Sequence, residues 1–320
     1  MPGLSRPETQ VIINRRAGAP QRGAAAGIEL SALFAAHGVA AEFTVVSSTR
    51  AARAAATAAS RRGVRMIVAV GGDGTVAAVA AALVGKPVVL GIVPRGTMNN
   101  LAYSLGIPTD PEGAVALIAS GAVCAIDVGT IRSDADPRER YFLETAGVGI
   151  TALAAPFGEA VNRGRWHRAL GWLREIVRAH GTRMQVELDQ GTPLFAETHL
   201  VTASNAPLVG PRAVVAPGAV LDDGLLDIAL FPGMTKLALA GYFAAAVLGR
   251  QFPPPLIGRH RARHVVVHPA RPRPATADLR LFPAAERWEI GILPRSLRVI
   301  AGSGPGLCRR APDEKEAVPQ

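Results

Sequence analysis

The chain has 320 residues, with 35 Lys and Arg against 25 Asp and Glu, so its formal charge is +10. This length fits about two domains, and the basic excess fits an acidic partner such as nucleotide phosphates or an anionic lipid surface. Aromatic residues make up only 5% of the chain, which argues against a base-stacking platform. We therefore expect no nucleic acid partner.

The cysteines and apolar runs limit the cellular setting. Cys124 and Cys308 are too few and too far apart for a disulfide framework or a zinc site, so we expect a reducing, cytoplasmic compartment. The polar first ten residues lack a signal-peptide core. The most apolar helical run, 237–248, is shorter than the roughly 20 residues that span a bilayer. That run is either a core helix or an interfacial helix.

In the first third of the chain, short apolar runs alternate with helix-compatible segments. This alternation predicts a parallel sheet with helices on both faces. Loops at the carboxyl ends of such strands lie at one edge of the sheet, where these folds bind ligands. We expect strands at 10–13, 41–46, 65–70 and 87–93, and helices at 24–36, 50–62, 76–84, 101–105 and 111–119.

The character of the chain changes after about residue 127, where strand-like runs predominate and turns are more frequent. We expect a mainly antiparallel β domain with one helix at 166–179. The predicted domains are 1–130 (α/β) and 131–292 (β), followed by a return strand at 293–302 and a mobile tail at 303–320. Strands are expected at 141–145, 184–188, 197–203, 226–231, 264–268, 288–292 and 297–300.

The most informative segment is Gly71-Gly72-Asp73-Gly74-Thr75, which directly follows the strand at 65–70. Glycines at a strand-to-helix turn let backbone N–H groups approach a phosphate closely, and the helix N-terminus adds positive charge. Asp73 is not attracted to phosphate, so it indicates a bridging metal ion or water. The alternative is a plain turn capped by Asp73. The lysine-containing P-loop and the protein-kinase catalytic loop are absent.

Together with a second loop, Pro94-Arg95-Gly96-Thr97-Met98-Asn99-Asn100, this segment resembles the diacylglycerol kinase catalytic domain family. That family includes bacterial lipid kinases and sphingosine kinases. NAD kinases share the glycine loop, so the ordered set of matches is more specific than one loop. The further matches are Asn14 followed by Gly18, Asn205 with the segment 215–227, and the segment 293–299.

The resemblance implies an N-terminal parallel-sheet nucleotide domain of the NAD kinase and diacylglycerol kinase type. A mainly antiparallel β-sandwich would carry the lipid substrate, and the chain end would return to the first domain. ATP and Mg²⁺ would lie in the cleft, and the γ-phosphoryl group would pass to a lipid hydroxyl. The implied location is cytoplasmic and peripheral at the inner membrane face, with the oligomeric state open between monomer and homodimer.

The resemblance also implies roles for individual residues. Asp73 would belong to the metal–water network at the phosphates, and Asp127 would be a carboxylate near the nucleotide. The remaining nucleotide-binding positions would be Asn14, Ser47 after the second strand, Gly71, Gly72, Gly74 and Thr75 in the first loop, and Gly96, Thr97 and Asn99 in the second.

A second cation site is implied in the Asp222-Asp223-Gly224-Leu225 loop. In some family members an ion is held there by one carboxylate and two backbone carbonyls, which correspond to Asp223, Val220 and Leu225. Such oxygen ligands suit a hard cation. An ordinary Asp-Gly hairpin turn explains the same residues equally well, so both interpretations stay open.

The chain departs from the family pattern at two places. The second loop usually ends in Asn-Asp but here ends in Asn99-Asn100. The usual Asp-Gly-Glu, whose glutamate is thought to deprotonate the lipid hydroxyl, corresponds to Asp278-Leu279-Arg280, and arginine cannot accept a proton. Asp73, Asp278 and Arg280 are therefore the candidate catalytic positions. Either Asp278 or another carboxylate is the base, or the register is shifted, or catalysis is weak or lost.

Three hypotheses follow. The first is an ATP-dependent lipid kinase that acts on diacylglycerol or a related lipid alcohol at the membrane surface. The second is a silent nucleotide or lipid binder that has lost its base at position 280. The third is an NAD-kinase-like enzyme. Arg163, Arg165 and Arg168 are either contacts to lipid headgroups or an ordinary exposed charged face.

Overall fold

The computed structural model describes residues 8–15, 23–152, 180–209, 213–247, 257–278 and 280–304, together with single positions at 167, 170, 174, 178 and 307. Most of the predicted helix at 166–179 and of the predicted tail lies outside these residues. Arg163, Arg165 and Arg168 also lie outside them, as does Gly18.

The N-terminal domain contains the predicted parallel sheet, in the order β4-β3-β1-β2. The central strands are buried between helices on both faces: Val11, Ile12, Ile67 and Val68 are all fully buried. Such continuous apolar runs are typical of a parallel sheet covered on both sides. The strands are β1 (Thr9–Asn14), β2 (Ala41–Val46), β3 (Met66–Gly71) and β4 (Val89–Pro94).

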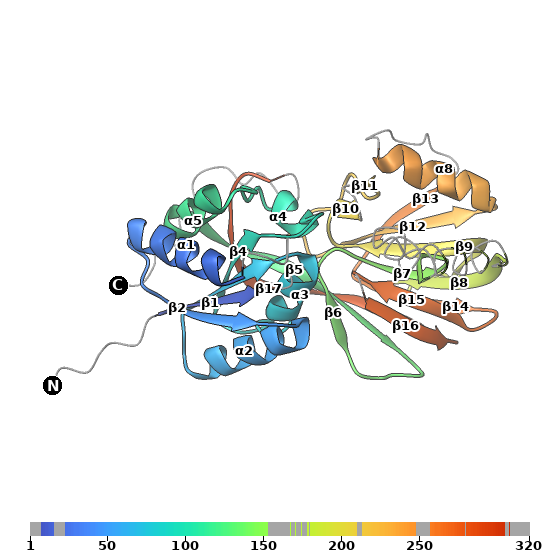
Figure 1. The fold of residues 1–320 in the computed structure, drawn as a ribbon. Coiled ribbons are helices and arrows are strands. Elements are labelled where there is room, and N and C mark those ends of the chain that lie inside the picture. Colours follow the sequence, from blue (N-terminus) through green and yellow to red (C-terminus); the bar gives the residue numbers. More distant parts are fainter. Residues whose placement is uncertain are drawn as a thin grey trace.

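Helices cover both faces of this sheet (Figure 1). On one face lie α1 (Gly23–Ala36), α4 (Asn100–Ser104) and α5 (Pro111–Ser120), and on the other lie α2 (Thr49–Arg61) and α3 (Asp73–Ala80). Helix α3 begins three residues before the predicted start because the glycine turn is tight. Gly72 is its N-cap, so Asp73 and Gly74 already belong to the first helical turn.

Two long strands, β5 (Ala122–Ser133) and β17 (Trp288–Ala301), run through both domains. They pair antiparallel along their length, and β17 also pairs with β4 in parallel. The strands predicted at 288–292 and 297–300 are thus one strand with an irregularity between Leu293 and Leu297. Within it Arg295 has a left-handed φ of 49°. Strand β5 was missed because a buried aspartate and small residues interrupt its apolar pattern.

The C-terminal domain is an antiparallel β-sandwich, as predicted. Its main path runs β16-β15-β7-β9-β8-β14-β17, β12 pairs with β9 and β13, and β6 pairs with β5. The core includes Phe142, Val186, Val201 and Trp288. The further elements are β6 (Arg140–Phe142), β7 (Thr145–Gly149), β8 (Thr182–Leu188), β9 (Leu194–Ser204), β10 (Leu208–Val209), β11 (Ala213–Val214), β12 (Leu226–Pro232), β13 (Gly258–Ala262), β14 (His264–Pro269), β15 (Arg273–Ala277) and β16 (Arg280–Ala285).

The apolar run at 237–248 forms most of α8 (Lys236–Val247), which packs on the β-sandwich. Leu239 and Tyr242 are 3% exposed and pack in a cluster with Phe231, whereas Leu237 is 84% exposed. Among the side chains of this helix that the structure describes, Leu239 and Tyr242 thus mark its buried face and Leu237 its exposed one. Among the helical residues that the structure describes, no segment has both the length and the apolar character needed to cross a bilayer.

Candidate active site

The two predicted loops pack directly against each other at the carboxyl ends of β3 and β4. A Cβ at Gly72 would lie 2.9 Å from the Cα of Gly96, and a Cβ at Gly96 would lie 2.5 Å from the Cα of Gly72. The Arg95 N–H also donates to the Gly71 carbonyl oxygen at 2.8 Å. Only glycine fits where the two backbones approach so closely.

Asp73 fastens the second loop to the first. Its Oδ2 accepts the Asn99 N–H at 3.0 Å and its Oδ1 accepts the Asn100 N–H at 2.9 Å. Asn99 has a left-handed φ of 52°, and its side chain bonds both the N–H and the carbonyl of Gly96. Burial raises the pKa of Asp73, while the amide hydrogen bonds oppose that shift. The second loop therefore owes its shape to one carboxylate and one asparagine.

The other predicted nucleotide-binding residues of the N-terminal strands lie at the same edge. Asn14, at the end of β1, donates from Nδ2 to Thr75 Oγ1 at 2.9 Å, and this contact is buried. Ser47 follows β2 directly and precedes Ser48, which caps α2. Thr97 lies in the second loop, between β4 and α4. The fold thus brings together positions that lie far apart in the sequence.

Glu144 is a site residue that the sequence analysis missed. Asn100 Nδ2 donates to Glu144 Oε2 at 3.1 Å, and Glu144 is only 9% exposed. Burial raises its pKa well above the usual range, and the charges of Asp278 and Asp73 raise it further. The available signal was a lone carboxylate within the strand-like run at 141–145, because glutamate is rarely buried without a partner.

The Asp278 carboxylate contacts the backbone of Glu144. Asp278 occupies the tight turn between β15 and β16, with a φ of 49°. Its carboxylate accepts the N–H groups of Leu143 and Glu144 at 2.9 Å each and that of Thr145 at 3.3 Å. Burial raises the pKa of Asp278 to about 6, against these amide hydrogen bonds. Asp73, Glu144 and Asp278 form what we call the carboxylate cluster.

Asp127 connects the two domains. It is fully buried, and its carboxylate accepts the Gly224 N–H at 2.6 Å and the Arg295 N–H at 2.7 Å. The Asn205 side chain donates to the Asp127 carbonyl at 3.1 Å and to the Leu143 carbonyl at 3.0 Å. In this structure Asp127 therefore anchors the loop after 221 and the irregular part of β17. Its role near the nucleotide stays a prediction.

We expect Asp127→Ala to destabilise the protein strongly, because the buried Gly224 N–H and the part-buried Arg295 N–H lose their acceptor. Each unsatisfied amide costs about 1–3 kcal/mol, which urea denaturation measures. The control is Asp223→Ala, which removes an ion pair with the partly exposed Arg261 and the acceptor of the Leu225 N–H. Because exposed ion pairs contribute little, this variant should lose less stability than Asp127→Ala. Equal losses in the two variants would contradict the anchoring role of Asp127.

Comparison with known proteins matches this architecture. Residues 8–131 match the model of the diacylglycerol kinase catalytic domain. Residues 145–301 match the YegS C-terminal NAD kinase beta sandwich-like domain. The chain belongs to the diacylglycerol kinase catalytic domain family.

Relatives in this family align with most of the chain. A diacylglycerol kinase of Mycobacterium tuberculosis is 28% identical over 256 residues, which is 78% of this chain and 81% of that protein. A probable YegS-like lipid kinase of Stenotrophomonas maltophilia is 29% identical over 255 residues, 76% of this chain and 80% of that protein. Both names are those of lipid kinases, so the family is one of kinase enzymes.

Solved structures show the same fold. A putative diacylglycerol kinase from Bacillus anthracis superposes with a TM-score of 0.74 at 20% identity and covers 93% of this chain and 99% of its own. An NAD kinase from Archaeoglobus fulgidus, solved in complex with ATP, superposes with a TM-score of 0.53 at 12% identity, covering 93% of this chain and 95% of its own.

At position 280 the chain has an arginine where the family pattern has a glutamate. Arg280 is exposed at the start of β16, and its guanidinium lies 5.2 Å from the centre of the Phe282 ring. Burial lowers its pKa, and the charges of Arg140, Arg53 and Arg138 lower it further, whereas that of Asp136 raises it. We call Arg53, Arg138, Arg140 and Arg280 the arginine cluster.

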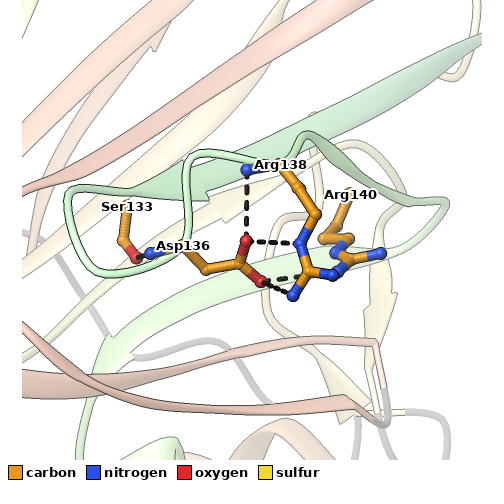
Figure 2. A network of polar contacts seen from close by, with 4 residues as sticks. All are labelled: Ser133, Asp136, Arg138 and Arg140. Atoms are coloured by element: carbon orange, nitrogen blue, oxygen red, sulfur yellow. Dashed lines mark hydrogen bonds and ion pairs between the residues drawn. The ribbon is translucent and has the colours of Figure 1, made fainter.

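Asp136 is the carboxylate within this cluster (Figure 2). It accepts hydrogen bonds from Arg138 Nε at 2.8 Å and from an Arg140 terminal nitrogen at 3.4 Å, while its own N–H donates to Ser133 Oγ. Within the described part of the chain, the buried Nε of Arg140 has no hydrogen-bond partner. The charges that act most on Arg280 are thus those of three other arginines and of Asp136, so its surroundings are mainly positive.

The predicted ion site at Val220, Asp223 and Leu225 shows the contacts of a turn. Asp223 Oδ1 accepts the Leu225 N–H at 3.0 Å, and the other oxygen pairs with the Arg261 guanidinium. Among the described residues, no group of three or more His, Cys, Asp or Glu side chains is placed so that it could hold a metal ion. A guanidinium already neutralises Asp223, so ion binding there stays a prediction.

Proposed function

We propose that the protein transfers the γ-phosphoryl group of ATP to the hydroxyl of diacylglycerol or a related lipid alcohol. The observation that carries this proposal is the close contact between Gly72 and Gly96, fixed by the two amide hydrogen bonds to Asp73. At Gly72 and Gly96 the two loop backbones carry no side chain, next to the N-terminus of α3. Backbone N–H groups at a helix N-terminus favour phosphate.

Mg²⁺ fits this site through water. Both oxygens of Asp73 already accept an amide, so Asp73 would hold a hydrated ion through its remaining lone pairs. When bound, such an ion neutralises charge on the phosphates. The chain's own contribution is positional: Asp73 fixes the second loop, Asn14 fixes Thr75, and the carboxylate cluster lies beside the loop through Asn100.

The experiment is transfer of radiolabel from ATP to a panel of acceptors, with nucleotide binding measured in parallel by calorimetry. We expect label in the lipid alcohols and none in NAD. Label in NAD alone would favour the NAD-kinase-like hypothesis, for which the fold shared with an NAD kinase is the supporting observation. ATP binding without transfer to any acceptor would favour the silent-binder hypothesis.

The proposed substrate is a lipid, so the enzyme must work at a membrane surface. We propose that the arginine cluster faces that surface, because basic residues near an anionic bilayer each contribute about 1 kcal/mol of binding, or about fivefold in affinity. Arg138 and Arg280 belong to the second domain, which in this proposal receives the lipid.

We expect the double variant Arg138→Gln, Arg280→Gln to bind vesicles containing phosphatidylglycerol about 25-fold more weakly, at about fivefold per arginine. Sedimentation with vesicles measures this, and the difference should shrink at high salt. The control is Arg65→Gln, which removes an exposed arginine that precedes β3, away from the glycine loops. A loss as large in the control, or no loss in the double variant, would contradict a specific contact by this cluster.

A further inference from the structure

We propose that Glu144 is the general base that takes the proton from the acceptor hydroxyl. This inference rests on the proposed phosphoryl transfer and names the residue that would do the work expected at position 280. The exposed Arg280 cannot do it, because a guanidinium carries no acceptor.

Within the carboxylate cluster, Glu144 differs from Asp73 and Asp278 in the hydrogen bonds that its oxygens accept. Both oxygens of Asp73 accept backbone N–H groups, and so do both oxygens of Asp278. Glu144 Oε2 accepts from Asn100, whereas Oε1 has no hydrogen-bond donor among the described residues and is not a fully buried atom. Glu144 is therefore the member of the cluster with one oxygen that accepts no hydrogen bond from the described residues.

The surrounding backbone holds Glu144 rigidly in place. The Asp278 carboxylate accepts the N–H groups of residues 143, 144 and 145. The Glu144 carbonyl in turn accepts the N–H groups of Asn205 at 2.8 Å and Ala206 at 3.1 Å. Asp278 and Asn205 are thus positioning residues. Supporting hydrogen bonds of this kind hold a reacting group in one geometry.

Asn100 joins this base to the phosphate side of the site. Its backbone N–H donates to Asp73 and its side chain donates to Glu144. Asn100 is 2% exposed, and its Oδ1 is buried without a partner among the described residues. An unpaired buried amide oxygen is costly, and this one belongs to the side chain that donates to Glu144. Asn100 therefore links the loop held by Asp73 to the side chain of Glu144.

The electrostatic surroundings suit a base that works near neutral pH. Burial raises the pKa of Glu144, and the facing carboxylates of Asp278 and Asp73 raise it further, against the hydrogen bond from Asn100. A base is most effective when its pKa lies near the working pH. Because only the ionised form accepts a proton, activity should rise with pH through a midpoint above that of an ordinary glutamate.

Phosphoryl transfer begins at the acceptor hydroxyl. The acceptor O–H bond breaks as its proton passes to Glu144 Oε1. The acceptor oxygen forms a bond to the γ-phosphorus, the bond from that phosphorus to the bridging oxygen breaks, and ADP leaves with the electron pair. The proton on Glu144 is then released to solvent. The products are the phosphorylated lipid and ADP.

The test compares Glu144→Gln with Glu144→Asp and a control, Glu286→Gln. Glu286 is an exposed carboxylate outside the cluster. We expect Glu144→Gln to lower kcat by about 10²-fold or more, the usual contribution of a general base, with ATP affinity retained. It should also abolish the acidic limb of the pH profile. Glu144→Asp should keep that limb and part of the activity, and Glu286→Gln should match the unaltered protein.

Three results would overturn the inference. Glu144→Gln with nearly full kcat and an unchanged pH profile would exclude Glu144 while leaving the kinase proposal intact. Loss of ATP affinity together with kcat would mean that Glu144 is structural. An unaltered protein that labels no acceptor would remove the proposed function and this inference with it, so the two failures are distinguishable.

Discussion

Gly96→Ala is expected to weaken ATP binding at least tenfold and to lower kcat/KM by about 10²-fold, the effect of a misplacement of about 1 Å in a site. The new Cβ would lie 2.5 Å from the Cα of Gly72 and 2.7 Å from Asn99 Oδ1. The Gly72 Cα is backbone, and Asn99 Oδ1 is held by the Gly96 N–H, so the two loops must separate. Calorimetric titration with ATP and a kinase assay measure the two effects.

The matched control for this variant is Gly27→Ala. Gly27 lies in α1, and a Cβ there would meet no atom within 4 Å. Replacing glycine by alanine inside a helix stabilises it by up to about 1 kcal/mol, so ATP affinity should stay unchanged and stability should rise slightly. If Gly96→Ala bound ATP as well as this control, the paired-loop description of the site would be wrong.

Asp73→Asn is expected to lower kcat/KM by about 10²- to 10³-fold, the range seen when one preorganised electrostatic contact is lost. An asparagine offers one acceptor oxygen where the Asn99 and Asn100 N–H groups need two. One buried amide would then face an NH₂ donor, at a cost of about 1–3 kcal/mol. Steady-state kinetics and urea denaturation together should show both losses.

Asp110→Asn serves as its control. Asp110 also accepts a backbone N–H, from Gly113 at 2.7 Å, at the N-terminus of α5. Asparagine and aspartate are about equally good N-caps, so stability and activity should both hold. An active, fully stable Asp73→Asn protein would mean that the second loop does not depend on the Asp73 carboxylate.

The nucleotide side of this site was predictable because it is local in sequence. The strand at 65–70, the glycine turn and the second loop each follow from neighbouring residues, and parallel strands place their loops at one edge. The predicted α/β fold and β-sandwich are confirmed. The apposition of Gly72 and Gly96 was not predictable, because it depends on how two loops from different strands meet.

The catalytic side was harder to predict because it depends on contacts between distant segments. Glu144 reaches Asn100 across 44 positions of the sequence, and Asp278 holds the backbone of Glu144 across 134. Strands β13, β15 and β16 were missed because charged side chains or proline interrupt them, and their pairing fixes the turn at Asp278. No local pattern around Asp278-Leu279-Arg280 shows that the aspartate turns inward while the arginine joins an exposed basic cluster.

Asn100 and Arg280, the two departures from the family pattern, each contact or lie near identified side chains. At position 100, an aspartate would face the Glu144 carboxylate, whereas Asn100 donates a hydrogen bond to it. At position 280, the arginine lies with Arg53, Arg138 and Arg140. In our proposal Glu144 is the base in place of residue 280, and Arg280 is part of the arginine cluster. Both departures are therefore compatible with an active enzyme.

The most direct test measures ADP release and lipid phosphate formation in the same reaction, with γ-labelled ATP and diacylglycerol in anionic vesicles. We predict equal amounts of ADP and of organic-extractable labelled lipid, both greatly reduced in Gly96→Ala. ADP release with no labelled lipid, or no turnover by a protein that binds ATP, would contradict phosphoryl transfer to a lipid hydroxyl.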